Sequence, residues 1–191
     1  MKVEIVEEPT TALEEYAAIP IAFEVRLVLD VADPGKGLGE FVLTERRLDV
    51  PYVKDYDAIN GGNPARWAAR FDLSRWGFLV ALVEGRRIGG AVVAFDTPDL
   101  SMLEGDGGHA VLWDIRVSPD ARGKKIGSAL FRAAEAWAQA RGCRQLRIET
   151  QNTNVPACRF YARQGCVLAA VNRFAYPALP DEIQLLWYKD L

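Results

Sequence analysis

The stretch VSPDARGKKIGSALF, residues 117–131, places three cationic side chains and two glycines where a hydrophobic strand gives way to an amphipathic helix. The first N–H groups of a helix have no partners inside it, and the aligned peptide dipoles put about half a positive charge there. Glycine lets the backbone approach an anion closely, and Arg122, Lys124 and Lys125 raise the local positive potential. The turn therefore predicts a pyrophosphate site. The alternative is an ordinary solvated helix start.

Several classes of site are disfavoured by the rest of the sequence. The turn lacks the GxxxxGK[ST] spacing of a P-loop, and the chain has no GxGxxG fingerprint, which argues against nucleoside triphosphates and NAD. One histidine and three cysteines without CxxC spacing favour neither a metal site nor a disulfide framework. The formal net charge of −3 argues against a nucleic-acid surface covering the whole molecule. Any anion site must therefore be local.

The pattern along the 191 residues predicts a single domain, 1–191, because one buried core is affordable at this length and no low-complexity spacer divides the chain. A polar stretch is expected up to Pro20, a surface excursion over 51–67 and a loop over 96–108. Hydrophobic periodicity predicts a helix that ends at Arg141-Gly142, with one face formed by Ile126, Ala129, Leu130, Ala133, Trp137 and Ala140. A shorter helix is expected between Asn154 and Gly165, with Pro156 in its first turn. Strands are predicted at 3–6, 23–31, 41–50, 77–85, 86–96, 109–117, 144–150, 166–178 and 182–191.

This order of elements predicts a mixed α/β sheet with helices on its faces and not a doubly wound parallel fold. Two motifs then carry a resemblance. Arg122-x-x-Lys125-x-Gly127, after a strand that ends Ile115-Arg116-Val117, resembles the acetyl-CoA-binding motif of GNAT acetyltransferases, with Lys125 in place of its first glycine. The run from Asn154 through Ala157 and Tyr161 to Gly165 resembles the family's N-x-x-A-x-x-x-Y-x-x-x-G helix.

Further residues narrow the resemblance to the streptothricin acetyltransferase branch: Pro51-Tyr52-x-Lys54-Asp55-Tyr56, Glu149-Thr150-Gln151, Phe174-x-Tyr176 and Trp187-Tyr188. The resemblance implies a mostly antiparallel sheet of six or seven strands, helices on both faces and a splay between two central parallel strands, 109–117 and 144–150. It also implies direct transfer of acetyl from acetyl-CoA to an amine held at that splay, without a metal. The residues expected to bind the coenzyme are Ile115, Arg116, Val117, Arg122, Gly123, Lys124, Lys125, Ile126, Gly127, Ser128, Asn154, Ala157 and Tyr161.

For the chemistry, Tyr161 occupies the family's acid position, where a phenol would protonate the departing thiolate. The alternative is that Tyr161 packs the short helix against the sheet. Asp114 and Glu149 are the candidates for the base that takes the ammonium proton, since they lie in the two strands that border the thioester. The alternative for Asp114 is a structural hydrogen-bonding group, and for Glu149 a strand-end cap.

For the acceptor, Tyr52, Asp55 and Tyr56 are expected to form a substrate lip whose aromatic faces and carboxylate receive a cationic amine. Trp113 and Tyr176 complete the predicted acceptor residues. A surface loop pinned by tyrosines is the other interpretation. Streptothricin relatives carry acidic residues after this motif, whereas this chain has Arg66, the wrong sign for a polycation.

The expected activity is therefore acetyl-CoA-dependent N-acetylation of a small-molecule amine, streptothricin-like antibiotics included. The alternatives are acetylation of a protein or peptide and a noncatalytic acyl-CoA-binding module. No apolar run reaches membrane-spanning length and the first residues lack a signal-peptide core, which predicts a cytoplasmic protein without membrane or nucleic-acid partners. A homodimer is compatible with the sequence.

Overall fold

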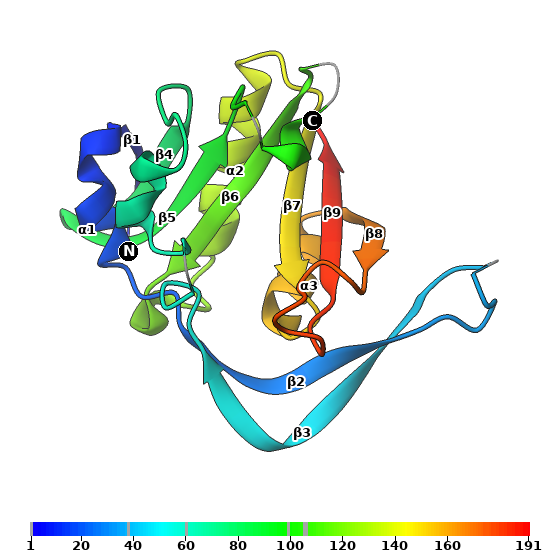
Figure 1. The fold of residues 1–191 in the computed structure, drawn as a ribbon. Coiled ribbons are helices and arrows are strands. Elements are labelled where there is room, and N and C mark those ends of the chain that lie inside the picture. The colour runs from blue at the N-terminus through cyan, green and yellow to red at the C-terminus, as the bar shows by residue number, and fades with distance from the viewer. Residues whose placement is uncertain (1, 38, 60, 99, 105–106) are drawn as a thin grey trace. The chain divides into compact units, whose positions relative to one another are not determined.

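The computed structural model describes residues 2–37, 39–59, 61–98, 100–104 and 107–191 (Figure 1). Its strands are β1 (Glu4–Glu8), β2 (Phe23–Ala32), β3 (Val42–Lys54), β4 (Gly77–Val83), β5 (Arg86–Ala94), β6 (His109–Val117), β7 (Gln145–Gln151), β8 (Val167–Asn172) and β9 (Gln184–Asp190). Its α-helices are α1 (Leu13–Ala17), α2 (Ile126–Gln139) and α3 (Val155–Arg163). Short 3-10 helices are η1 (Thr10–Ala12), η2 (Pro64–Ala69), η3 (Ser101–Leu103) and η4 (Pro119–Ala121).

Seven of these strands form one mixed sheet, as predicted. Their order in the sheet is β1-β4-β5-β6-β7-β9-β8. The pairs β1/β4, β4/β5 and β5/β6 are antiparallel, and β6 pairs with β7 in parallel. The parallel ladder joins His109–Leu112 to Gln145–Ile148 and ends there, although β6 continues to Val117. That early end of the ladder is the interruption that a splay between the two strands requires.

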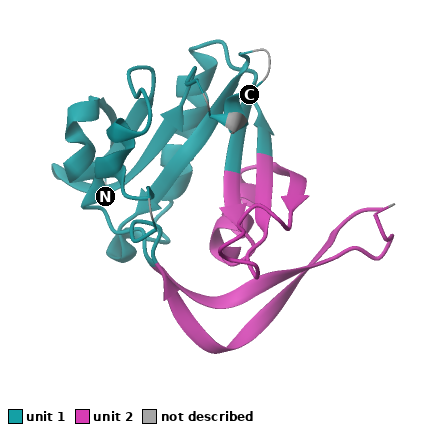
Figure 2. Cartoon of the chain, viewed as in Figure 1, with its two compact units in different colours: residues 1–22, 55–148, 188–191 teal, residues 23–54, 149–187 magenta. Residues whose placement is uncertain are grey.

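The chain divides into two compact units (Figure 2). Unit 1 consists of residues 1–22, 55–148 and 188–191, and unit 2 of residues 23–54 and 149–187. Each is described separately below.

In unit 1, helices cover both faces of the sheet at β5. A Cβ on Gly89 would lie 3.2 Å from Cδ1 of Leu130 in α2, whereas a Cβ on Gly90 would lie 2.4 Å from Cε2 of Tyr16 in α1. Because neighbouring strand residues point to opposite faces, α2 lies on one face and α1 on the other. The prediction of helices on both faces is confirmed.

Aromatic residues form a core on the α1 side of unit 1, and the sequence pattern did not predict it. Residues up to Pro20 were expected to be polar, but Leu13 and Tyr16 of α1 are buried. The excursion over 51–67 was expected at the surface, yet Trp67 in η2 is only 2% exposed and packs near Trp76, with ring centroids 6.3 Å apart. The polar and glycine residues next to these aromatics along the chain leave no periodic pattern that would indicate burial. Their burial depends on tertiary packing and not on local periodicity.

Helix α2 follows the predicted pattern with a wider buried face. Ile126, Leu130 and Trp137 are buried as expected, Ala129 and Ala133 are half-buried, and Ala140 is exposed beyond the last helical residue. Phe131, Ala134 and Ala138 are buried as well. The packed stripe of a helix on a sheet is broader than a single row of positions.

In unit 2, β2 and β3 form a separate antiparallel two-stranded sheet, called the ribbon here. The prediction that residues from Pro51 onward are irregular is wrong, because Val25 pairs with Tyr52 and Phe23 with Lys54. Pro51 lies where the register shifts between these pairs and the one formed by Leu27 and Arg47, a position that tolerates a residue without an N–H. The predicted loop over 96–108 contains η3; residues 99, 105 and 106 of it lie outside the described residues.

Candidate functional site

The turn before α2 has the backbone of an anion-binding loop. Residues 122–125 are exposed, and Gly123 and Lys125 have left-handed φ angles of 77° and 63°. No atom lies within 4 Å of where a Cβ on Gly123 would be. Helix α2 begins at Ile126, so the N–H groups of its first turn have no carbonyl partner within the helix.

The cationic side chains of this turn are held by backbone carbonyl groups. Nε of Arg122 donates to the carbonyl of Val117 at 3.0 Å and its NH2 group to Ala22 at 3.2 Å, while Nζ of Lys124 donates to Asp120 at 2.8 Å. These contacts place cationic groups beside an open helix start without occupying it. The donor set, the open backbone and the charge fit a diphosphate.

Lys125 keeps the backbone conformation that a glycine would adopt freely. The acetyl-CoA motif has glycine here, and a residue with a Cβ replaces it without strain only if the position has right-handed helical dihedrals. The positive φ of 63° shows that it does not. A residue with a Cβ pays about 1–2 kcal/mol in the left-handed region, so Lys125 introduces strain at the start of α2.

In β6 of unit 1, Asp114 and Arg116 form a buried ion-pair network with Asp57. The Arg116 side chain is fully buried and donates to Asp114 at 2.9 and 2.8 Å and to Asp57 at 3.0 and 3.1 Å. The hydroxyl of Tyr16 donates to Asp114 at 2.6 Å. Burial opposes the charge of Arg116, but the charge and hydrogen bonds of Asp114 outweigh it and raise the Arg116 pKa.

This network bears on two predicted site residues. Asp114 already accepts hydrogen bonds from a guanidinium and a phenol, which favours its structural interpretation over the role of a base. Arg116 was expected among the coenzyme-binding residues, and its buried guanidinium leaves only its backbone for such a contact. Its neighbours Ile115 and Val117 are half-buried.

In unit 2, α3 presents the second predicted motif. The Asn154 side chain caps the helix by accepting from the N–H of Ala157 at 3.2 Å. Tyr161 is 5% exposed, and its ring lies 6.4 Å from that of Trp187. Burial raises the pKa of the Cys158 thiol to about 12, so this thiol stays protonated near neutral pH.

Glu149 and Tyr176, predicted separately as base and acceptor residue, are hydrogen-bonded to each other. The Tyr176 hydroxyl donates to Oε1 of Glu149 at 2.6 Å and accepts from the Gln151 amide at 2.8 Å. Glu149 is half-buried. The contact gives Glu149 one fixed partner.

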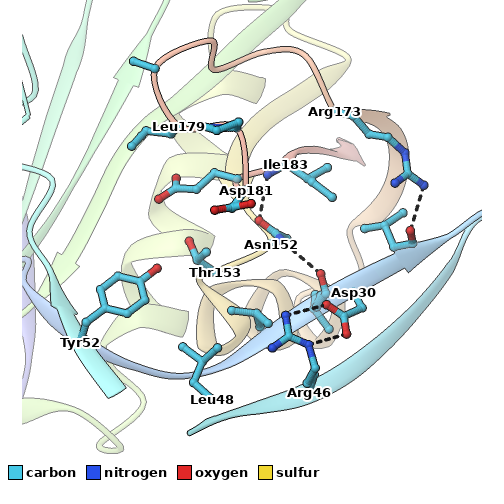
Figure 3. Close-up of a pocket in the computed structure, with 16 residues that line it drawn as sticks. Asp30, Arg46, Leu48, Tyr52, Asn152, Thr153, Arg173, Leu179, Asp181 and Ile183 are labelled. Carbon is cyan, nitrogen blue, oxygen red and sulfur yellow. Dashed lines mark hydrogen bonds and ion pairs between the residues drawn. The ribbon is translucent and has the colours of Figure 1, made fainter. Parts of the chain in front are cut away.

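A groove of about 740 Å³ lies within unit 2 (Figure 3). The ribbon supplies one part of its lining and the segment before β9 another. The lining residues are Val28, Leu29, Asp30, Val31, Arg46, Leu48, Tyr52, Asn152, Thr153, Arg173, Ala178, Leu179, Pro180, Asp181, Glu182 and Ile183.

Polar groups gather around Tyr52 in this groove. Burial first and the charge of Glu182 second raise the Tyr52 pKa, with the Thr153 hydroxyl acting in the opposite direction. Figure 3 shows the Tyr52 hydroxyl pointing toward Thr153, whose Oγ1 is buried and makes no well-formed hydrogen bond with the described residues. Glu182 forms an ion pair with Lys54.

The predicted acceptor residues are distributed over both units. Tyr52 lines the groove, whereas Asp55, Tyr56 and Trp113 belong to unit 1. Trp113 is half-buried and packs on Phe71 with ring centroids 5.2 Å apart. The sequence analysis missed Thr153 and Glu182, which no spacing signal links to Tyr52.

Comparison with known proteins identifies a matching family and similar solved structures. Residues 47–166 match the model of the acetyltransferase (GNAT) family. Streptothricin acetyltransferase from Escherichia coli is 31% identical over 87% of this chain and 84% of its own length. Streptothricin acetyltransferase A from Bacillus subtilis (strain 168) is 39% identical over 42% of this chain and 48% of its own length, so that match spans about half of the relative.

Two solved structures extend the likeness over the chain. Nourseothricin acetyltransferase superposes with a TM-score of 0.77 and 25% identity, over 100% of this chain and 99% of the other. A Bacillus anthracis str. Ames protein in complex with acetyl coenzyme A superposes with a TM-score of 0.76 and 24% identity, over 100% and 98%.

The chain belongs to the acetyltransferase (GNAT) family. It is an N-acetyltransferase. None of the described helices combines the length and apolar character that crossing a membrane demands. Within the described ranges no group of three or more His, Cys, Asp or Glu side chains is placed to hold a metal ion.

Proposed function

We propose that this enzyme acetylates a primary amine of a small molecule that binds in the groove of unit 2. The groove carries the proposal, because about 740 Å³ suits a small molecule and its walls mix apolar side chains with a few polar groups. Tyr52, Thr153 and Glu182 would meet the ammonium end of the acceptor. The curated relatives make streptothricin the first acceptor to test.

The acetyl donor, acetyl-CoA, would be held by residues of the turn before α2 and by residues of α3 and its N-cap. Arg122, Gly123, Lys124, Lys125, Ile126, Gly127 and Ser128 would bind the diphosphate through backbone N–H groups and cationic side chains. Backbone groups of Ile115, Arg116 and Val117 would pair with the pantetheine arm, and Asn154, Ala157 and Tyr161 would lie along it.

In the transfer step, the neutral amine attacks the thioester carbonyl carbon, a C–N bond forms and the C–S bond breaks. Glu149 would first take the proton that the ammonium loses, which gives the neutral amine, and Tyr161 would donate its phenol proton to the departing sulfur. The proton that the attacking nitrogen loses as the amide forms would return to the Tyr161 phenolate. Tyr176 fixes the Glu149 carboxylate through its 2.6 Å hydrogen bond. Asp114 is the weaker candidate for the base because of its ion pair with Arg116.

A panel of amines with a thiol-release readout tests the proposal. It should include streptothricin, short peptides with free N-termini and simple diamines. A saturable small-molecule acceptor is the expected result, with turnover lowered by Glu182→Gln. Turnover with peptides alone would replace the proposal by protein acetylation, and no thiol release with any amine would favour a noncatalytic acyl-CoA-binding module.

The roles of individual residues predict separable effects. Tyr161→Phe should lower kcat about 100-fold, the usual contribution of a general acid, and leave acetyl-CoA affinity unchanged. Arg122→Ala should instead weaken acetyl-CoA binding, measured by titration calorimetry, and this loss should shrink at high salt. Wild-type turnover by Tyr161→Phe across the pH range would remove the acid assignment.

We also propose that the enzyme works in the cytoplasm and without nucleic acid. A homodimer is the further proposal for its assembly. Light scattering of the purified protein gives the oligomeric state directly.

A further inference from the structure

The ribbon begins and ends at two short segments of unit 1. The chain leaves unit 1 after Ala22 and returns to it at Asp55, and the ribbon strands β2 and β3 lie between these points. We call residues 19–22 the entry root and residues 55–57 the exit root. The ribbon carries Tyr52 and much of the groove lining, and the two roots are the unit 1 segments to which its ends are covalently joined.

Arg116 is hydrogen-bonded to both roots. Its NH1 group donates to the carbonyl of Ile19 in the entry root at 3.1 Å and to Asp57 in the exit root at 3.0 Å. Its NH2 group donates to the other Asp57 oxygen at 3.1 Å. One guanidinium in β6 therefore joins the two ends of the ribbon inside unit 1.

All five N–H donors of Arg116 are used. Two go to Asp114, two to Asp57 and one to Ile19. A guanidinium presents these donors in a rigid planar fork. Because all five donors are engaged at once, the five acceptor oxygens are held in fixed positions relative to one another. Asp114 is itself held by Tyr16 of α1 at 2.6 Å.

The burial of this cluster makes the arrangement hard to distort. The Arg116 side chain is fully buried, and Asp114 and Asp57 are 7% and 17% exposed. Removing a partner from a buried charge leaves it uncompensated, so the roots cannot drift from Arg116 cheaply. The exit root is stiffened further by the Asp55 carboxylate, which accepts from the N–H of Asp57 at 3.0 Å.

A second arginine holds the entry root. Arg122 donates to the carbonyl of Ala22 at 3.2 Å and to that of Val117, the last residue of β6, at 3.0 Å. Arg116 of β6 and Arg122 of the turn that follows β6 thus each donate to one backbone carbonyl of the entry root.

We infer that Arg116 is a positioning residue for the acceptor: its side chain, which contacts neither substrate, clamps the entry and exit roots and so holds the two ends of the ribbon that carries the proposed acceptor wall. The inference rests on the proposed function for its kinetic consequence. The clamp itself is a structural claim that can be measured without turnover.

Asp57→Asn is the sharpest variant, because it removes one charge and one acceptor from the exit root and leaves the Arg116–Asp114 pair in place. Asp72→Asn is the matched control: Asp72 is another unit 1 carboxylate that accepts a backbone N–H, from Ser74 at 2.9 Å, and it lies outside both roots. Hydrogen–deuterium exchange and steady-state kinetics are compared for wild type and both variants.

We expect Asp57→Asn to speed exchange over residues 23–32 and 42–54 about tenfold and to raise the KM for the amine about tenfold, with the KM for acetyl-CoA within about twofold of wild type. Asp72→Asn should change neither. Unchanged exchange in Asp57→Asn would refute the clamp, and faster exchange with an unchanged amine KM would refute its positioning role. Absence of turnover by wild-type enzyme with every amine would sink the proposed function instead, and the exchange result would still decide the clamp.

Arg116→Lys separates geometry from charge. Lysine keeps the cation but cannot present a planar fork to two carboxylates and a carbonyl. We expect this variant to fold, as shown by circular dichroism, and to raise the amine KM as Asp57→Asn does. A folded Arg116→Lys enzyme with wild-type kinetics and exchange would overturn the inference.

Discussion

At the residue scale, Lys125 combines a side chain suited to an anion with a backbone suited to glycine. Its cation lies in an exposed turn beside the start of α2, where it adds positive potential. Its φ of 63° costs about 1–2 kcal/mol for any residue with a Cβ. Charge and strain at this position therefore have opposite effects on binding and on stability.

We predict that Lys125→Gly stabilises the protein by about 1 kcal/mol, because glycine adopts the left-handed conformation without steric cost. Glycine also loses more backbone freedom on folding, and this loss offsets part of the gain. Urea unfolding followed by circular dichroism measures the change. Lys124→Gly is the control, since Lys124 is not among the residues with positive φ and should gain nothing. Equal effects of the two substitutions would show that the φ of Lys125 is not strained.

Local motifs could be predicted from the sequence, whereas partners distant in sequence could not. The turn from Arg122 to Gly127 is continuous, so its charges and glycines indicate an anion site directly. Arg116 was expected to bind coenzyme because it lies in the strand that precedes this turn, but its side chain pairs with Asp57, 59 residues earlier. No spacing rule relates two charges that only the fold brings together.

At the element scale, two adjacent glycines let β5 carry helices on both faces. Gly90 leaves room for the Tyr16 ring of α1, and Gly89 leaves room for Leu130 of α2. Protein interiors are packed as closely as organic crystals. Larger side chains at these two positions would therefore push the helices away from the sheet. The Tyr16 hydroxyl reaches Asp114 only because α1 lies this close.

Gly90→Ala should destabilise the protein by about 1–3 kcal/mol, because its Cβ would lie 2.4 Å from the Tyr16 ring. Thermal unfolding of single and double variants tests the cause. In a Tyr16→Ala background the same substitution should cost much less, since the obstructing ring is gone. Additive effects would place the cost in the strand backbone and not in the contact with α1.

The elements also show which parts of the fold a sequence pattern reveals. The hairpin of β4 and β5 turns at Glu84 and Gly85, with φ angles of 50° and 76°, at the boundary between the strands predicted over 77–85 and 86–96. The groove was missed because its walls come from residues as far apart as Val28, Asn152 and Ile183. Periodicity reports which residues are buried within an element and carries no information on which elements meet.

At the scale of the whole molecule, a net charge of −3 coexists with a cationic turn at the start of α2. The overall charge would not attract the anionic acetyl-CoA that we propose as donor, so attraction would have to come from this turn at short range. Buried ionisable groups are equally local, yet they affect the stability of the entire fold through the protons that folding binds or releases.

Tyr16 makes that linkage measurable at alkaline pH. Burial, followed by the charge of Asp114, raises its pKa well above the ordinary value of 10. Above pH 10 the unfolded chain therefore loses the phenol proton that the folded protein keeps, and the free energy of unfolding falls by about 1.4 kcal/mol per pH unit until the folded pKa is reached. The contribution is complete below pH 10 and is lost above it.

Tyr16→Phe removes this proton from both states, and it also removes the hydrogen bond to Asp114. At pH 8 the variant should thus be less stable than wild type by about 1–3 kcal/mol. As the pH rises from 10 to 11, the wild type should lose about 1 kcal/mol more than the variant, because the unfolded phenol is already half deprotonated at pH 10, so the two stabilities converge. Urea unfolding at pH 8, 9, 10 and 11 gives both curves, and a difference that stays constant across this range would show that Tyr16 titrates alike in the folded and unfolded protein.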